Sequence, residues 1–326
     1  MCGFVGIISP AVPVRDDLLS AMRDRLIHRG PDNGSNWILP TGRIALGHRR
    51  LSIIDMSHSA DQPMASADGM LRIVFNGEIY NYLELKQDLL ALGHEFRTNS
   101  DTEVLLVGFQ HWGEGVLTRL NGMFAFVVWD EKSRRMFVAR DRFGEKPLFV
   151  GKGRLHTVVF ASEMKAINVH PLMPCSVNDD AVGRFGSGAW YEDDEQTFFK
   201  DIERFPPAHA AWYREDGTQE RRWRYWTPDY TKVDYSLKPR EAVEKFAELM
   251  QRSISLRLRS DVPVGSSLSG GLDSSVIVGY LSRERGKSSF TQNTFSAIFP
   301  DDPTMSEDKE IDAVVSHTGV HSFQVA

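Results

Sequence analysis

The chain has 326 residues, a length typical of two domains, and its 41% apolar and 25% charged content is that of a globular protein. Its net charge of −6 argues against a basic nucleic-acid-binding surface, and no apolar run approaches the ~20 residues of a membrane span. The N-terminus lacks a signal-peptide pattern and the two cysteines suggest no disulfide framework, so we expect a cytoplasmic location.

The first seven residues, Met1–Ile7, place a cysteine directly after the initiator methionine. Removal of Met1 would leave Cys2 with a thiol and a free α-amino group. The amine, with a reference pKa of ~7.7–8.0, could take the thiol proton directly or through one water, so one residue would supply a nucleophile and its base. The apolar residues after Gly3 predict a buried strand that would hold Cys2 in place. The alternative is an ordinary small residue near a frayed terminus.

A helix is predicted over residues 16–28, because its apolar side chains share one face and a Gly-Pro turn follows. That turn either simply ends the helix or holds Arg29 and Asp32 beside a site. Further on, Arg50 precedes the apolar segment 51–54, at the edge of a predicted strand. Its guanidinium could bind a carboxylate through two hydrogen bonds, and the alternative is a surface charge.

A strand predicted over residues 71–75 runs into Asn76 and Gly77. Asn-Gly is a strong turn signal. The side-chain amide of Asn76 and the backbone N–H of Gly77 are also suitable donors to an oxyanion. Later in the chain, Ser100 or Asp101 is a good helix N-cap. The other role open to Asp101 is a carboxylate that binds an ammonium group.

Apolar patterns predict the remaining elements of this part of the chain, which are helices at 82–92 and 178–185, a helix that follows the segment 98–103 and runs through Trp112, and strands at 123–129, 135–140, 147–150, 155–162 and 210–213. Many strands with a few helices between them indicate stacked sheets with helical layers outside. Residues 227–240 are polar and Pro-flanked, which is typical of a linker. We therefore divide the chain into a first domain at 1–213, a linker at 214–239 and a second domain at 240–326.

The second domain alternates helices and strands, which implies a parallel sheet, with helices at 240–258, 276–285 and 307–318, and strands at 262–268, 295–299 and 321–325. The Gly-rich loop Ser269–Ser275 lies between the first strand and its helix, where backbone N–H groups and the helix dipole would hold a phosphate. It lacks the Gly-Lys-Ser/Thr of a Walker loop, and Asp273 would instead reach a magnesium ion on a pyrophosphate.

These motifs together resemble those of the class II glutamine amidotransferases and, within them, the glutamine-hydrolysing asparagine synthetases. They occur in the order of the family and cover nearly the whole chain. The matching segments are Met1–Gly3, His28–Asp32, Arg50–Asp55, Gln62–Pro63, Asn76–Asn81, Ser100–Asp101, Asp141–Gly144, Ala161–Ala166 and Ser269–Ser275.

The resemblance implies an N-terminal-nucleophile fold for the first domain, which is a four-layer αββα sandwich of the α+β class. It implies a partial ATP-pyrophosphatase domain, an α/β parallel sheet, for the second. By the same resemblance Cys2 attacks the side-chain amide of glutamine, and Asn76 and Gly77 form the oxyanion hole. The residues implied to bind the rest of glutamine are Arg50 at its α-carboxylate, Asp101 with Glu78 at its α-ammonium, and Leu51, Ser52, Ile53 and Ile54 along the pocket wall.

The resemblance also implies that ammonia passes internally to a second site, where ATP and Mg²⁺ convert aspartate or another small carboxylate into an acyl-adenylate for amidation. The residues implied to bind ATP are Leu268 and Ala297 at the adenine, and Ser269, Gly270, Gly271, Leu272, Asp273 and Ser274 at the pyrophosphate, with Asp273 also on magnesium. A homodimer is compatible with this interpretation.

Two departures from the family pattern leave more than one carboxylate as the possible acceptor of the ammonia. The chain stops at Ala326, where family members continue, so the resemblance predicts a truncated synthetase domain. Segment 295–300 resembles paralogues of cell-surface polysaccharide pathways, which amidate other carboxylates, about as well as it resembles the biosynthetic enzymes. Two other classes also stay open: a glutaminase or regulatory glutamine-binding module, and a self-processing N-terminal-nucleophile hydrolase that acts on a different amide.

Overall fold

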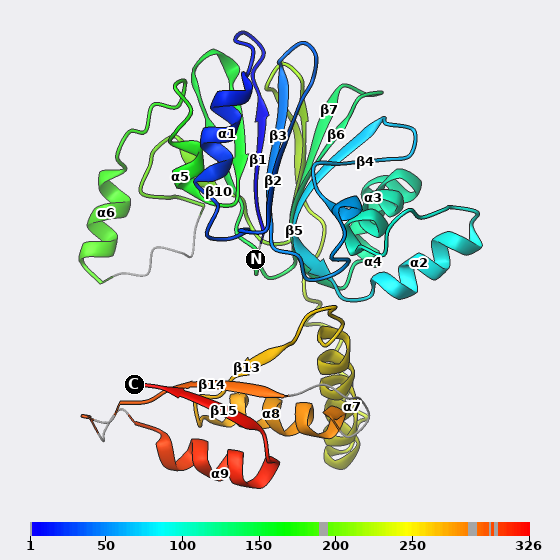
Figure 1. Ribbon diagram of the computed structural model, residues 1–326, viewed down its shortest axis with the longest axis vertical. Helices are drawn as coiled ribbons and strands as arrows, with labels where there is room; N and C mark the ends of the chain where they lie inside the picture. Colours follow the sequence, from blue (N-terminus) through cyan, green and yellow to red (C-terminus); the bar gives the residue numbers. More distant parts are fainter. Residues whose placement is uncertain (1, 189–194, 286–291, 300, 303–305) are drawn as a thin grey trace. The chain divides into compact units, whose positions relative to one another are not determined.

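The computed structural model describes residues 2–188, 195–285, 292–299, 301–302 and 306–326. The chain divides into two compact units, Met1–Asp229 and Tyr230–Ala326, which are described separately here (Figure 1). Met1, whose removal the sequence analysis predicts, lies outside the described residues. None of the helices in the described part of the chain is long and apolar enough to cross a membrane.

Within the described residues, two six-stranded sheets form the centre of the first unit, and neighbouring strands in both are antiparallel. The first sheet has the spatial order β10 (Ile202–Arg204), β8 (Phe149–Lys152), β9 (Val158–Ala161), β1 (Gly3–Ile8), β3 (Ile44–Arg50) and β2 (Asn33–Ile38). The second has the order β12 (Gln219–Arg224), β11 (His209–Arg214), β7 (Arg135–Arg140), β6 (Gly122–Asp130), β5 (Leu71–Ile79) and β4 (Met64–Ala65).

Helices pack on the outer face of each sheet (Figure 1). The first sheet carries α1 (Asp16–Asp24) and α5 (Met164–Ile167), and the second carries α2 (Tyr82–Ala91), α3 (Asp101–Trp112) and α4 (Val116–Arg119). The remaining helical segments of the unit are α6 (Asp179–Gly186) and the 3-10 turns η1 (His58–Ala60), η2 (Gly113–Gly115) and η3 (Arg154–His156). The predicted four-layer αββα sandwich is therefore confirmed.

Strand β1 lies at the centre of this sandwich, and all of its residues are buried. Phe4 and Ile8 point into the core between the two sheets, whereas Val5 and Ile7 belong to the core under α1 and α5. This alternation follows from the two-residue period of a strand. A strand buried on both faces cannot shift without disrupting two cores, so it fixes the position of Cys2 directly before it.

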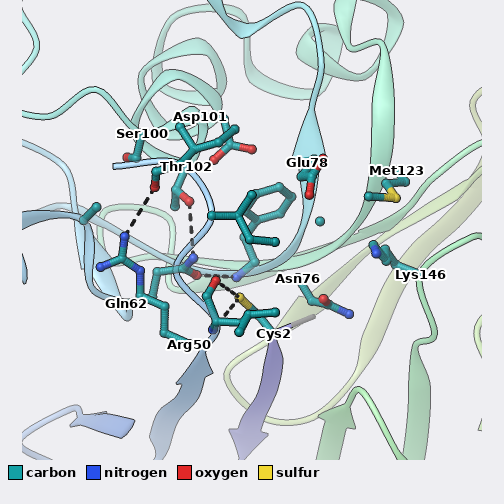
Figure 2. Close-up of a pocket in the computed structure, with 16 residues that line it drawn as sticks. Cys2, Arg50, Gln62, Asn76, Glu78, Ser100, Asp101, Thr102, Met123 and Lys146 are labelled. Atoms are coloured by element: carbon teal, nitrogen blue, oxygen red, sulfur yellow. Dashed lines mark hydrogen bonds between the residues drawn. The ribbon is translucent and has the colours of Figure 1, made fainter. Parts of the chain in front are cut away.

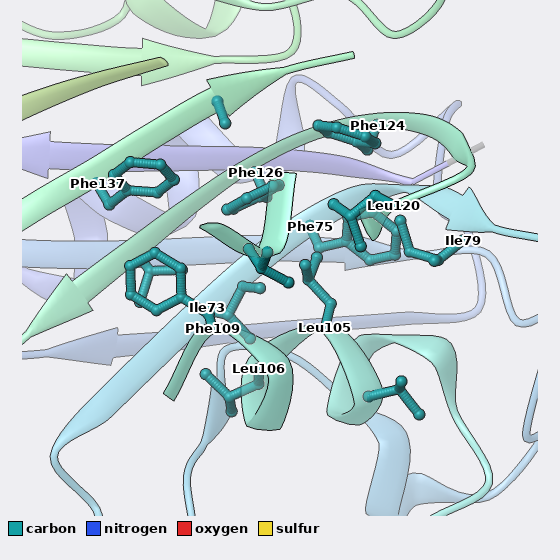
Figure 3. Packing of buried hydrophobic residues seen from close by; sticks show 14 of the residues in the cluster. Ile73, Phe75, Ile79, Leu105, Leu106, Phe109, Leu120, Phe124, Phe126 and Phe137 are labelled. Atoms are coloured by element: carbon teal, nitrogen blue, oxygen red, sulfur yellow. The ribbon is translucent and has the colours of Figure 1, made fainter. Parts of the chain in front are cut away.

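The third core lies between the second sheet and α3, and it is rich in phenylalanine (Figure 3). Phe126 and Phe137 of neighbouring strands lie with ring centroids 5.9 Å apart. Phe109 of α3 packs against Phe137 at 4.9 Å. Such tilted ring pairs add to the energy of apolar burial. This core holds α3, and with it Asp101, against β5.

The turn interpretation of Asn76 and Gly77 is wrong. Both residues continue β5, where they pair with Ala125 and Phe124 of β6. A Cβ on Gly77 would lie 2.2 Å from the carbonyl oxygen of Met123. The glycine therefore permits close approach of two strands here rather than a reversal of the chain.

Several element limits also differ from the prediction. The helix predicted over 16–28 ends at Asp24. The segment 214–239, which we expected to be a linker, contains the last residue of β11 and the whole of strand β12, and β12 pairs with β11. Its sequence, QERRWR, is mostly exposed at the sheet edge, so the apolar alternation that predicts a strand is missing. In agreement with the prediction, Ser100 caps α3, because its hydroxyl oxygen accepts a hydrogen bond from the N–H of Glu103 at 3.2 Å.

The second unit contains the parallel sheet that the strand–helix alternation predicts. Its strands have the order β13 (Gly265–Ser267), β14 (Asn293–Ala297) and β15 (His321–Val325). Its helices are α7 (Pro239–Arg257), α8 (Leu272–Arg285) and α9 (Asp308–Thr318). In the described residues of this unit, Leu268, Val278, Ile311 and Val320 form a buried apolar cluster, and Ile254, Leu256 and Leu281 are also buried.

Candidate active site

A pocket lies in the first unit where the start of β1 and the ends of β3 and β5 meet the start of α3 (Figure 2). Its volume of about 90 Å³ favours a small molecule. The residues that line it are Cys2, Arg50, Leu51, Ile53, Ile54, Ala60, Gln62, Phe75, Asn76, Gly77, Glu78, Ser100, Asp101, Thr102, Met123 and Lys146. Of the residues predicted to act on glutamine, all except Ser52 line this pocket.

Sheet register brings Cys2 beside the end of β3. Gly3 pairs with Arg49, so the residues after Arg49 lie next to Cys2. The thiol sulfur of Cys2 lies 3.4 Å from the backbone nitrogen of Leu51, which donates to it. Burial raises the pKa of the Cys2 thiol, and the hydrogen bond from Leu51 opposes that increase. A thiol in this environment needs a base before it can act as a nucleophile.

The turn after α1 contacts the site at two points. Nε of Arg29 donates to the carbonyl oxygen of Cys2 at 3.0 Å. The carboxylate of Asp32 accepts a hydrogen bond from the backbone N–H of Ser52 at 2.8 Å. The turn therefore lies beside the pocket residue Cys2, as one of its two interpretations predicts, and a role in a functional site stays a prediction. Ser52 does not line the pocket, and its contact with this turn is made by its backbone N–H.

The side-chain amide of Asn76 is completely buried in the pocket wall (Figure 2). Within the described part of the chain, neither its nitrogen nor its oxygen has a hydrogen-bond partner. Leaving a buried amide unsatisfied costs about 1–3 kcal/mol. Such a group in a native structure calls for an explanation, and a ligand oxygen in this pocket would provide one.

Two carboxylates face the pocket from different elements. Asp101 is the first residue of α3, and its Oδ2 accepts a hydrogen bond from the N–H of Ile79 at 3.0 Å. Burial raises the pKa of Asp101 from 3.8 to about 7; the N–H of Ile79 opposes this, and the nearby charge of Glu78 adds to it. A cation bound between the two carboxylates would remove this electrostatic cost.

Arg50 is buried at the rim of the pocket, and its guanidinium organises the loop that follows it. Nη1 donates to the carbonyl oxygen of Ser57 at 2.7 Å and to Oδ1 of Asp61 at 2.7 Å. Nη2 donates to the carbonyl oxygens of Ile54 and Asp55. The surface-charge alternative is therefore wrong. Arg50 holds the pocket wall and is also one of the cations that line the pocket.

Sequence reasoning assigned no role to Gln62 or Lys146, which also line the pocket. Oε1 of Gln62 accepts from the N–H of Phe75 at 2.6 Å, and Nε2 donates to the hydroxyl of Thr102 at 3.2 Å. Gln62 therefore ties β5 to α3. The only available signal was its place in the Gln-Pro match to the family.

Lys146 is buried and lies on the same side of the pocket as Asn76 (Figure 2). Its backbone is fixed by Asp141, whose carboxylate accepts hydrogen bonds from the N–H groups of Phe143, Glu145 and Lys146. Burial lowers the pKa of Lys146, and the charge of Glu78 opposes this. A lysine in a loop gives no periodic signal, so the sequence could not assign it to the site.

The second unit places the predicted ATP-binding residues along one edge of its sheet. Leu268 follows β13 and Ala297 ends β14, and the register pairs Ser267 with Phe295. The two residues therefore lie at the carboxyl ends of neighbouring parallel strands, where such sheets bind ligands. Gly270 has a φ of +84°, a conformation that favours glycine.

The segment from Ser269 to Ser274 is held by its own side chains, and from Leu272 on it belongs to α8, which begins four residues earlier than predicted. The hydroxyl oxygens of these two serines lie 3.1 Å apart. Asp273 is exposed in the first turn of α8. A single carboxylate beside a phosphate-binding turn suits Mg²⁺, which is commonly held by one or two carboxylates plus phosphate oxygens. Among the residues that the structure describes, no group of three or more His, Cys, Asp or Glu side chains could hold a metal ion.

Comparison with known proteins gives two family matches. The glutamine amidotransferase domain matches residues 1–226, and asparagine synthase matches residues 245–326. Glutamine-hydrolyzing asparagine synthetase 3 of Bacillus subtilis (strain 168) is 38% identical over 282 residues, which is 85% of this chain and 44% of that protein. Glutamine-hydrolyzing asparagine synthetase 1 of the same strain is 36% identical over 282 residues, 85% of this chain and 43% of that protein. The chain thus spans less than half the length of these relatives.

A solved structure shares the fold at lower identity. Glutamine phosphoribosylpyrophosphate amidotransferase from B. subtilis, complexed with ADP and GMP, aligns with a TM-score of 0.51 and 18% identity. The alignment covers 99% of this chain and 65% of that one. At this identity the likeness shows the fold alone, and it agrees with the αββα sandwich described above.

Proposed function

Because the chain belongs to the glutamine amidotransferase domain family, we propose that its first unit hydrolyses glutamine to glutamate and ammonia with Cys2 as the nucleophile. The observation that carries this proposal is the arrangement around Asn76. A buried amide without a partner in the described residues lines the same small pocket as a thiol. An oxygen of a bound substrate is the group that this amide lacks, and an amide carbonyl attacked by the thiol supplies one.

In this mechanism the α-amine of Cys2, free after removal of Met1, takes the thiol proton. The sulfur attacks the carbonyl carbon of the glutamine side chain, and the negative charge moves to the amide oxygen. Asn76 and the N–H of Gly77 would stabilise that oxyanion. The amine then returns the proton to the leaving nitrogen, so ammonia departs and a thioester remains. Water adds to the thioester and releases glutamate and the thiol.

Recognition of glutamine would use the charged groups of the pocket. Asp101 with Glu78 would bind the α-ammonium group, and Arg50 the α-carboxylate, with Leu51, Ile53 and Ile54 as the wall. This assignment has a physical basis in the raised pKa of Asp101, because a bound cation would compensate the burial of its charge and, in addition, the repulsion from Glu78. Arg50 would act in two ways, as a charge and as the support of its loop.

For the second unit we propose the acceptor half of an asparagine synthetase, supported by its family match over residues 245–326. Ser269 to Ser274 would hold the pyrophosphate of ATP, with Leu268 and Ala297 at the adenine. Asp273 would hold Mg²⁺, which would neutralise phosphate charge while aspartate is adenylated. Ammonia from the first reaction would then convert the adenylate to asparagine. We place the reaction in the cytoplasm, and a homodimer stays a prediction that sedimentation can test.

The test begins with substrate choice. The purified chain is incubated with glutamine, asparagine and simple acyl-amides, and ammonium release is measured. We expect release from glutamine at least tenfold faster than from the others. The acyl-amides lack the two charged ends that Arg50 and Asp101 would bind, and the side chain of asparagine is one methylene too short to bring its amide to Cys2 while both ends are bound. Ammonium release from acyl-amides at the same rate would contradict the proposal that glutamine is the substrate. It would favour a hydrolase that acts on another amide.

The acceptor half is tested by adding aspartate, ATP and Mg²⁺ and following glutamate, AMP and asparagine separately. Equal amounts of AMP and asparagine would support aspartate as the acceptor. AMP formed only with a different carboxylate would replace aspartate by that acid. If glutamate forms and no AMP is found under any condition, the function of this chain is limited to the hydrolysis of glutamine.

A further inference from the structure

The end of β9 contacts β1 through both its backbone and a side chain. The N–H of Ser162 donates to the carbonyl oxygen of Phe4 at 3.1 Å, and the hydroxyl of Ser162 accepts from the N–H of Phe4 at 3.1 Å. Phe4 lies two residues after Cys2. Glu163 follows Ser162 directly. The two hydrogen bonds between Ser162 and Phe4 therefore place Glu163 close to Cys2.

Glu163 collects three basic side chains around one carboxylate. Nη1 of Arg29 and Nε2 of His28 each lie 2.9 Å from Oε1, and Nζ of Lys165 lies 2.9 Å from Oε2. Burial alone would raise the pKa of Glu163, but the hydrogen bonds from Arg29, Lys165 and His28 lower it to about 2. The group is therefore ionised at neutral pH.

The ion pair of Glu163 leads to Cys2 through one side chain. Arg29 uses Nη1 on Glu163 and Nε on the carbonyl oxygen of Cys2, at 2.9 and 3.0 Å. Its side chain is only 9% exposed, so this contact is shielded from water. Glu163 does not line the pocket and cannot touch a molecule bound there directly. Among the described contacts of Glu163, the one with Arg29 connects it to Cys2.

We propose that Glu163 is a positioning residue that holds Arg29 on the carbonyl oxygen of Cys2 and thereby fixes the orientation of the thiol and the α-amine. Once Met1 is removed, no peptide bond precedes Cys2. The hydrogen bond to its carbonyl oxygen then helps to hold its backbone in place. Rotation about its Cα–C bond would move the amine away from its place beside the pocket. Misplacement by about 1 Å can reduce a rate by up to about 100-fold. The inference rests on the proposed role of Cys2 as the nucleophile.

The test is Glu163→Gln, which keeps the shape of the side chain and removes its charge. The matched control is Glu203→Gln, because Glu203 lies in the same sheet and makes a surface ion pair with Lys152 at 2.6 Å. We expect Glu163→Gln to lower kcat for glutamine hydrolysis about tenfold with KM changed less than twofold. Glu203→Gln should change neither value by more than twofold.

A second readout does not require glutamine. The protein is treated with iodoacetamide, and the labelling rates of Cys2 and Cys175 are measured by mass spectrometry in the same sample. Cys175 serves as the internal reference, because it lies outside the pocket and contacts Asn168 instead. Glu163→Gln should lower the Cys2 to Cys175 ratio at least fivefold. A carboxylate with a merely structural role would lower Tm and leave this ratio unchanged.

Coupling to Arg29 is tested with Arg29→Lys, which keeps the charge but loses the fork that spans Glu163 and Cys2. The double variant should be no slower than the slower single variant, within twofold. Additive losses would overturn the inference, and so would an unchanged kcat and labelling ratio in Glu163→Gln. If wild type releases no ammonia from glutamine while the labelling ratio still falls in Glu163→Gln, the proposed function fails and the positioning role stands.

Discussion

The two units of this chain differ in how completely their sheets are covered. In the first unit, apolar side chains pack on both faces of each sheet and form separate cores under α1, between the sheets and under α3. In the second unit the described core is small, and Phe295 and Phe323 stack on the sheet with 51% and 42% of their surface exposed. Full coverage makes a scaffold rigid, because a shift of any strand disturbs two packed layers.

That difference bears on function. The candidate donor site is assembled from four elements far apart in sequence, and it needs a scaffold that holds side chains to within about 0.5 Å. Three of its groups start from well-packed elements: Cys2 precedes β1, Asn76 lies in β5, and Asp101 begins α3. The loop proposed to bind phosphate in the second unit depends on one strand and one helix, with a smaller core behind them. We therefore expect glutamine hydrolysis by the first unit to tolerate substitutions that destabilise the second unit. Substitutions that destabilise the first unit should lower it.

The largest effect expected in the first unit is that of Cys2→Ala, which should lower glutamine hydrolysis at least about 1,000-fold, because Cys2 supplies the thiol among the residues that line the pocket. Binding of glutamine should persist, since the charged groups of the pocket are unchanged. Isothermal titration and ammonium release measure the two effects. Cys175→Ala is the control and should keep wild-type activity. Labelling by a glutamine-like diazo ketone at Cys175 instead of Cys2 would contradict the assignment.

Packing gives the next largest effect. Phe126 is fully buried in the core under α3 (Figure 3). Phe126→Ala should lower the free energy of unfolding of the first unit by about 3–5 kcal/mol, the usual cost of deleting a buried ring. Denaturant unfolding followed by tryptophan fluorescence measures it. A loss below about 1 kcal/mol would mean that the first unit is no better packed than the second.

Arg50→Ala should lower kcat/KM for glutamine at least tenfold. Removing one partner of a buried charge pair costs roughly 2–5 kcal/mol, and here Asp61 would also lose its ion pair. Glutamine analogues separate the two roles of Arg50. If wild type hydrolyses an analogue without the α-carboxylate as fast as glutamine, the residue supports the loop and does not bind substrate.

The pKa of Asp101 predicts a pH dependence. To bind an ammonium group the carboxyl must be ionised, and its pKa is about 7 in the empty site. KM for glutamine should therefore rise as pH falls below 7, by up to tenfold per pH unit. Steady-state kinetics between pH 5.5 and 8.5 measure this, and a flat KM would contradict the role of Asp101.

The same group predicts the sign of a stability change. Because its pKa is raised from 3.8 to about 7 on folding, the folded state binds more protons, and this contribution to stability falls as pH rises from about 4 to 7. Asp101→Asn removes that cost and can still accept the hydrogen bond from Ile79. The variant should melt above wild type at pH 8, with the difference lost near pH 4, while its glutamine activity is low.

Much of this arrangement follows from sequence, and the parts that do not have physical reasons. Apolar periodicity indicates the sandwich, and short motifs indicate Cys2, Arg50 and Asp101, because those signals are local. The strand β12 was missed because an exposed edge strand needs no apolar alternation. The turn at Asn76 was wrong because pairing with β6 overrides the local turn preference.

The contacts of the site are harder still to predict. Glu163 meets Arg29 across 134 residues, and Lys146 enters the pocket from a loop. Neither contact has a repeating pattern, so only the folded chain shows them. The loop Ser269–Ser274 was easier, since strand, loop and helix follow one another directly.

The smallest effect is expected from Phe323→Ala, the counterpart of Phe126→Ala in the second unit. Phe323 stacks on Phe295 with ring centroids 5.2 Å apart, and both rings keep about half of their surface in solvent. Removing a half-exposed ring together with its stacking contact lowers the free energy of unfolding by about 1 kcal/mol. The variant should therefore shift the second unit's transition slightly, leave the first unit's transition in place, and leave glutamine hydrolysis within twofold of wild type. Limited proteolysis should cut residues 230–326 before the first unit in both proteins. If Phe323→Ala is as costly as Phe126→Ala, that sheet face is buried in solution, and the contrast between the two units no longer holds.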